Sequence, residues 1–182
     1  MRSRCTMKHL GITVALLSVL AAPGVARAER IQATLTGYEE VPVVSTIASG
    51  EFRAMISRDD QSIDYELTYI GLQGNVTQAH IHVAQLSVNG SVVIWLCQTV
   101  SPFLDPTGLA TTCPAGQLTE AVVRGTITTA NVIAGSQAGQ QLTAGDLGEV
   151  IAAIRAGAAY VNVHTSLSPG GEIRGQIRAS HR

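Results

Sequence analysis

The sequence predicts an all-β protein: an antiparallel β-sandwich or barrel, immunoglobulin-like or Greek-key in type, with one short helix at about residues 144–156. Three observations predict this fold. Short segments in which apolar and polar residues alternate recur along the chain, and Gly, Pro and Asn-Gly turn signals separate them. Only one segment has convincing helical periodicity, so a layered β architecture is favoured over an α/β one.

Alternation defines each expected strand. In residues 63–70, for example, Ile63, Tyr65 and Leu67 alternate with polar residues, which is typical of a half-buried strand. Asn89-Gly90 predicts a hairpin turn between two such strands. The expected strands, in chain order, are residues 31–36, 50–56, 63–70, 77–83, 92–96, 120–128, 159–165 and 172–178.

The single helix has identifiable ends. Thr143 or Asp146 can cap its N-terminus, and Gly157 can close its C-terminus in the left-handed conformation. Its apolar face is made of residues at helical spacing, namely Leu147, Val150, Ile151 and Ile154.

Residues 1–28 are predicted to be a signal peptide. Positive residues precede an apolar run over residues 10–25, and Ala26-Arg27-Ala28 matches the small-x-small cleavage pattern. The alternative, an uncleaved signal anchor, is disfavoured because the run is short for a membrane span and Pro23-Gly24 interrupts it. Cleavage would leave residues 29–182 as a single extracytoplasmic domain, secreted or periplasmic.

The charge of the cleaved chain limits its partners. Cleavage would remove four of the 12 basic residues and none of the 13 acidic ones, which changes the net charge from −1 to −5 and leaves no lysine. This argues against nucleic acid and against anionic membrane surfaces, so a protein or a small ligand is the expected partner. Asn75 and Asn89 match the N-glycosylation pattern, which matters only in a eukaryotic secretory pathway.

Two cysteines, Cys97 and Cys113, remain after cleavage and predict one disulfide in an exported protein. The alternative is a pair of free buried thiols. A cysteine metal site is disfavoured because the sequence has neither a CxxC nor a Cys-His pair.

Three histidines are candidate metal ligands. His80 and His82 are two residues apart on one strand, so their side chains project from the same face, and His164 on another strand can supply a third imidazole. Three neutral imidazoles suit copper or zinc. The alternative is a structural role, in which half-buried histidines bond to neighbouring groups. The remaining histidine of the cleaved chain, His181, lies next to the C-terminus.

Other polar residues have weaker signals. Glu172 and Arg174, two apart on one strand, can form an ion pair, while Trp95 and Tyr160 are expected in the core. The sequence has no nucleophile elbow and no phosphate-binding glycine loop, so no catalytic residue is predicted. Carboxylates that could orient metal-bound imidazoles are Glu39, Glu40 and Glu172.

Several stretches in order resemble one family. Residues 35–42 (LTGYEEVP), 79–82 (AHIH), 160–165 (YVNVHT) and 169–176 (PGGEIRGQ) resemble the CHRD domain, first described in chordin, over residues 30–178. One departure is Val43, where the family often has a second proline. The resemblance implies an exported immunoglobulin-like domain and no particular reaction. Chordin's role against bone morphogenetic proteins is not implied, because its cysteine-rich modules are missing here.

A second similarity concerns the histidines. Copper/zinc superoxide dismutases also hold copper with a His-x-His strand and a histidine that ends another strand. This sequence has no candidate for their bridging histidine, so dismutase activity is not predicted. The predicted function is an exported binding or scaffold module without catalysis. The alternative is a copper- or zinc-binding protein using His80, His82 and His164, and a copper-dependent oxidoreductase ranks last.

N-terminal sequencing of the exported protein tests the cleavage site. We expect the mature chain to begin at Glu29, because Ala28 completes the cleavage pattern. A membrane-bound product that begins at Met1 would show that the segment is retained as an anchor.

Overall fold

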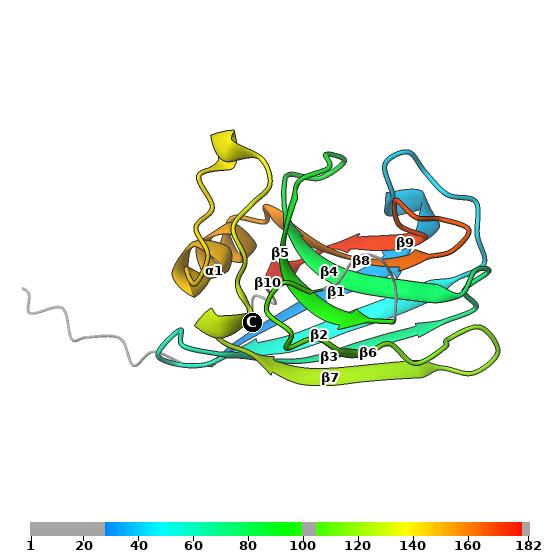
Figure 1. Ribbon diagram of the computed structural model, residues 1–182, viewed down its shortest axis with the longest axis horizontal. Coiled ribbons are helices and arrows are strands. Elements are labelled where there is room, and N and C mark those ends of the chain that lie inside the picture. The colour runs from blue at the N-terminus through cyan, green and yellow to red at the C-terminus, as the bar shows by residue number, and fades with distance from the viewer. Residues whose placement is uncertain (1–27, 100–104, 180–182) are drawn as a thin grey trace, which may run out of the picture.

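The computed structural model describes residues 28–99 and 105–179, so the predicted signal peptide and His181 lie outside the described residues. The described strands belong to one sheet that is nearly closed into a barrel-like shape (Figure 1). The strands are β1 (Glu29–Thr36), β2 (Ser49–Ile56), β3 (Ile63–Ile70), β4 (Val76–Val83), β5 (Ser91–Gln98), β6 (Thr111–Thr112), β7 (Ala121–Ile127), β8 (Ala159–Thr165), β9 (Ile173–Gln176) and β10 (Arg178–Ala179).

The strand order is β6-β5-β4-β8-β9-β1-β2-β3-β7, and β10 also pairs with β1. Every pairing is antiparallel except that between β5 and β6. Figure 1 shows β1, β2, β3 and β7 below β4, β5, β8 and β9, so the single sheet folds into two facing layers. The predicted all-β sandwich or barrel is confirmed.

Each expected strand is present, with two differences. The last one, residues 172–178, is divided at Ile177 into β9, which joins β8 to β1, and β10 on β1. The Asn89-Gly90 hairpin exists, since β4 and β5 pair antiparallel, but its connection runs from residue 84 to residue 90 rather than being a two-residue turn. Asn89 is held within this longer loop because its amide donates to Val41 O at 3.0 Å.

The predicted helix is α1 (Leu147–Arg155), which lies within the expected range. Asp146 caps it, because Asp146 Oδ1 accepts a hydrogen bond from Glu149 N at 3.0 Å. Gly157 follows with φ +69°, the left-handed conformation that ends helices. No helix among the described residues is long and apolar enough to cross a membrane.

The 3₁₀-helices are short segments in the connections. They are η1 (Gly37–Glu39), η2 (Thr129–Asn131) and η3 (Ala138–Gln140).

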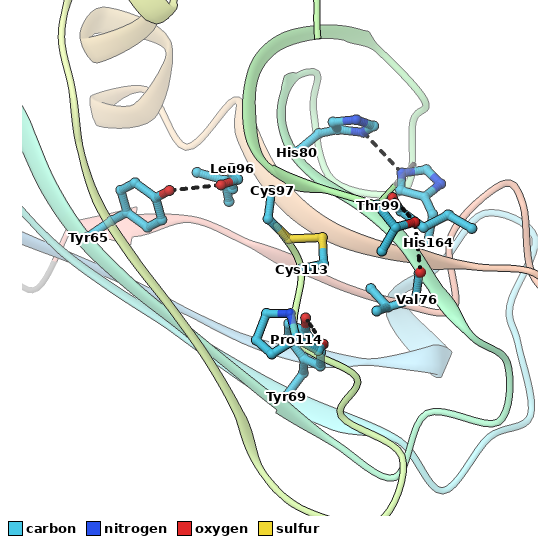
Figure 2. The surroundings of a disulfide bond; sticks show 11 residues. Tyr65, Tyr69, Val76, His80, Leu96, Cys97, Thr99, Cys113, Pro114 and His164 are labelled. Carbon is cyan, nitrogen blue, oxygen red and sulfur yellow. Dashed lines mark hydrogen bonds between the residues drawn. A yellow bond between two sulfur atoms is a disulfide. The ribbon is translucent and has the colours of Figure 1, made fainter. Parts of the chain in front are cut away.

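Two tyrosines and a disulfide link the layers (Figure 2). Tyr65 of β3 donates to Leu96 O of β5 at 2.9 Å, and Tyr69 donates to Pro114 O at 2.6 Å. Cys97 of β5 is bonded to Cys113, which confirms the predicted disulfide and ties β5 to the segment before β7.

The core lies between the layers, where Phe52, Leu67, Ile81 and Val161 have no exposed surface. β8 differs from an ordinary half-exposed strand because all seven of its residues are buried. One face of β8 contributes Val161 to the core. The other face carries polar residues beneath the loops, and this face holds the candidate site.

Replacing both Cys97 and Cys113 with alanine should lower the free energy of unfolding by about 3 kcal/mol, because an open loop of this length leaves the unfolded chain more disordered. Chemical denaturation with and without reductant measures the effect. Reductant should destabilise the wild-type protein and leave the double variant unchanged. Equal stability of the oxidised wild type and the variant would contradict the role given to the bridge.

Candidate metal centre

Strand register assembles the polar face. In the pairing of β4 with β8, His82 lies opposite Tyr160 and His80 opposite Asn162. In the pairing of β8 with β9, Asn162 lies opposite Arg174. Because side chains two apart on a strand share a face, His164 of β8 projects on the same side as Asn162.

Three loops cover this face: residues 37–48 between β1 and β2, residues 84–90 between β4 and β5, and residues 166–172 between β8 and β9. Figure 1 shows them on the outer side of the upper layer. Thr46 of the first loop donates to Glu172 Oε1 at 2.9 Å, and Asn89 ties the second loop to the first. The loops therefore act as one cover over the sheet.

The structure brings the three predicted histidines together in a buried cluster. His80 is 2% exposed, and His82 and His164 are each 6% exposed. One ring nitrogen of each lies within 4.8 Å of those of the other two. His80 Nδ1 is 3.2 Å from His164 Nε2, the contact drawn in Figure 2.

Backbone carbonyls orient two of the rings. His82 Nδ1 lies 3.0 Å from Gly90 O, and His164 Nδ1 lies 2.9 Å from Pro169 O. A carbonyl oxygen only accepts, so each Nδ1 carries the proton and each Nε2 keeps its lone pair. Among the described residues, the Nε2 atoms of His80 and His82 are buried without a hydrogen-bond partner. Hydrogen bonds from Nδ1 to a backbone carbonyl, like those of His82 and His164, are typical of metal-bound histidines.

A glycine allows the carbonyl of the second loop to reach His82. A Cβ on Gly90 would collide with Val83 O at the end of β4. Only glycine therefore lets the loop return closely enough for its carbonyl to meet the imidazole.

Burial keeps the cluster neutral. Burial, with a smaller contribution from the neighbouring histidines, lowers the pKa of His80 to about 2. Burial also lowers the pKa of His82 to about 4, although the bond to Gly90 opposes the shift. The pKa of His164 is lowered for the same reason, against the bond to Pro169. At neutral pH all three imidazoles are therefore uncharged, with one N–H and one free lone pair each, which is the form that binds metals.

Aromatic residues support two of the histidines. The ring of His82 is nearly parallel to that of Tyr160, with centroids 4.5 Å apart and planes at 7°. Arg174 Cζ lies 3.4 Å from the centroid of the Tyr160 ring. Trp95 meets His80 edge-on at 4.2 Å between centroids. Tyr160 is buried as predicted, with 2% of its surface exposed, whereas Trp95 is only partly buried. Both rings lie against histidines of the cluster.

Glu172 and Arg174 have separate partners instead of the predicted ion pair. The four groups that donate to the Glu172 carboxylate are Thr46 Oγ1, Gln73 N, Gly74 N and Thr165 Oγ1. Arg174 donates to Asn89 Oδ1 and to the carbonyls of Val88 and Gln85. Glu172 thus holds loops together, and carbonyls rather than carboxylates contact the outer nitrogens of His82 and His164.

Asn162 is a site residue for which the sequence predicts no role, although the period-2 signal puts it on the same strand face as His164. In the structure it is 2% exposed, and its Oδ1 lies 2.9 Å from His164 Nε2. The carbonyls of Gly90 and Pro169 carry no such signal, since any residue type has a carbonyl and only the loop conformation places it.

The geometry defines an all-β domain with a buried three-histidine cluster on the outer face of one layer. A model of the CHRD domain family matches residues 31–177, so the chain belongs to the CHRD family. No curated protein matches the chain, and no solved structure matches it.

Acid should destabilise the metal-free protein. The ordinary histidine pKa is 6.5, so His80, His82 and His164 bind protons below that pH in the unfolded chain. In the folded protein their buried rings stay uncharged at the same pH. Glu40 acts in the opposite direction, because burial raises its pKa to about 7 and the folded state then binds the extra proton. Between pH 5 and 6 unfolding should take up about two protons net, a slope of about 3 kcal/mol per pH unit.

Denaturant titrations across this pH range measure the slope. His82→Phe, which keeps a ring against Tyr160, should reduce the uptake by about one proton. A stability that does not change between pH 5 and 6 would contradict the burial of three neutral rings.

Proposed function

We propose that this CHRD-family protein is an extracytoplasmic binding module that holds one copper or zinc ion with His80, His82 and His164. The observation that carries the proposal is the convergence of three buried, neutral imidazoles within 4.8 Å. Each imidazole projects from a strand, so the cluster is fixed by the sheet rather than by a loop.

The hydrogen-bond partners of the histidine nitrogens support this proposal over a purely structural role. Histidines that only stabilise a fold are normally satisfied by donors and acceptors around them. Within the described part of the chain, His82 Nε2 keeps a lone pair that is buried and unpaired. A bound cation would compensate this lone pair, which no protein group satisfies.

Imidazole nitrogen is the ligand type that suits copper and zinc, whereas magnesium and calcium select oxygen ligands. Cys97 and Cys113 are consumed by the disulfide, so thiolate ligation is not part of the proposal. The disulfide and the CHRD fold fit an extracellular protein, and export through the predicted signal peptide belongs to this proposal.

A second candidate is a binding or scaffold module whose role needs no metal. Exposed apolar side chains gather on the three covering loops and favour a contact surface for a protein partner. They are Tyr38, Val43, Ile47, Leu86, Val88 and Leu167.

Metal titration of the mature protein separates the two candidates. After treatment with a chelator, the protein should bind one Zn(II) or Cu(II) ion per chain in calorimetry, and its melting temperature should rise because the ion binds only the folded state. Absence of stoichiometric binding with either ion would reject the metal function and leave the metal-independent module.

Substitution of ligands tests the assignment of the site. His82→Phe and His164→Leu should each weaken binding by more than about 100-fold, which exceeds the usual cost of removing an outer-shell partner. His181→Ala is the matched control and should bind like the wild type, because His181 is not one of the three proposed ligands. Unchanged affinity in His82→Phe or His164→Leu would place any bound ion elsewhere.

A further inference from the structure

Asn162 occupies a central position on the histidine face. The register places it directly between His80 of β4 and Arg174 of β9. It is 2% exposed, so its amide must find partners within the protein. The oxygen and the nitrogen of its side-chain amide face different neighbours.

The oxygen of the amide faces the histidines. Asn162 Oδ1 lies 2.9 Å from His164 Nε2. That nitrogen carries a lone pair, because the ring proton is on Nδ1 and is donated to Pro169 O. A carbonyl-type oxygen and an unprotonated nitrogen both present electron pairs at this distance, and neither can donate to the other. A cation held between them would replace this repulsion with two coordinate bonds.

The nitrogen of the amide faces Glu40. A Cβ added to Gly171 would collide with Glu40 Oε1 and would lie 2.8 Å from Asn162 Nδ2, so the two groups share the space above that glycine. Gly171 has φ +128°, a conformation that other residues rarely adopt. The Glu40 carboxyl is 5% exposed and lies on the nitrogen side of the amide, while Oδ1 lies on the side of the histidines.

The spacing of the candidate ligand atoms fits a single ion. Four ligand atoms at tetrahedral positions with bonds of about 2.0–2.1 Å lie about 3.3 Å from one another. His80 Nδ1 is 3.2 Å from His164 Nε2, and Asn162 Oδ1 is 2.9 Å from the same nitrogen. His82 completes the set, with its ligand nitrogen within 4.8 Å of those of the other histidines.

We propose that Asn162 Oδ1 is the fourth ligand of the metal site, and that Glu40 is the positioning residue that fixes this amide. This inference rests on the proposed metal function. An N₃O donor set that contains an amide oxygen favours a divalent ion, Zn(II) or Cu(II), over Cu(I), which prefers softer ligands.

The fourth ligand also determines what the metal does. Catalytic zinc sites keep one position open for water or substrate, whereas structural sites fill all four with protein ligands. With Asn162 in place and the cluster buried beneath three loops, the ion has no open position. The metal is then a structural part of the CHRD domain, which agrees with a binding module that performs no reaction.

Three variants at two positions test the fourth ligand. Asn162→Leu keeps the approximate volume and removes the oxygen, so it should weaken Zn(II) binding by about 10-fold or more. Asn162→Asp keeps the oxygen and adds a negative charge in a dry site, so it should tighten Zn(II) binding by about 10-fold. Asn131→Leu is the matched control, since the Asn131 side-chain oxygen accepts a hydrogen bond from Thr128 N at η2, and this variant should leave the affinity unchanged.

Co(II) provides a readout that a merely structural residue would not change. Four-coordinate Co(II) absorbs visible light strongly, and the wild type should show such a spectrum. Asn162→Leu should alter the band positions or intensity, because the ion must replace the lost oxygen with water or remain three-coordinate. Glu40→Gln should retain the spectrum, because its amide oxygen can still accept from Asn162.

The outcomes separate this inference from the proposed function. If the wild type binds Zn(II) and Asn162→Leu binds it equally with the same Co(II) spectrum, Asn162 is not a ligand and the three-histidine site stands. An equal loss of affinity in Asn131→Leu and Asn162→Leu would also overturn the inference. If the wild type binds neither ion, both the inference and the metal function are wrong. Should Asn162→Leu fail to fold, the tightening in Asn162→Asp decides the question.

Discussion

The antiparallel register of β4, β8 and β9 is the constraint on which the site depends. It sets His80, Asn162 and Arg174 in one cross-strand row and His82 beside Tyr160 in the next. A shift of one residue in β8 would turn Asn162 and His164 toward the core and would expose Val161 and Val163 to the loops. The apolar core on the other face therefore fixes the polar cluster, because slipping the register would bury polar groups among hydrocarbon.

The loops add the second requirement, which is exclusion of water. A histidine on the outer face of a sheet would ordinarily be solvated and partly protonated near pH 6.5. Here the three covering loops bury the rings, and burial depresses each pKa. Carbonyls from two of these loops orient two of the rings, and Glu172 connects Thr46 with the turn after β3. The three loops therefore exclude water from the cluster and also orient its imidazoles.

Much of this architecture could be predicted from local patterns. Alternation located the strands, and the spacing of His80 and His82 placed both on one face. The division at Ile177 could not be seen, because β9 and β10 form one continuous alternating segment in the sequence. Residue type predicts Trp95 in the core, but Trp95 is only partly buried and lies against His80 on the histidine face. The predicted Glu172–Arg174 ion pair does not form because Glu172 lies before β9. The backbone turns there, so strand alternation does not put the two side chains on one face.

X-ray absorption spectroscopy of the Zn(II)-loaded protein tests whether two strands deliver three imidazoles to one ion. Three imidazole nitrogens and one oxygen should lie about 2.0–2.1 Å from the zinc. A first shell with fewer than two imidazoles, or one made chiefly of oxygen, would contradict the three-histidine site.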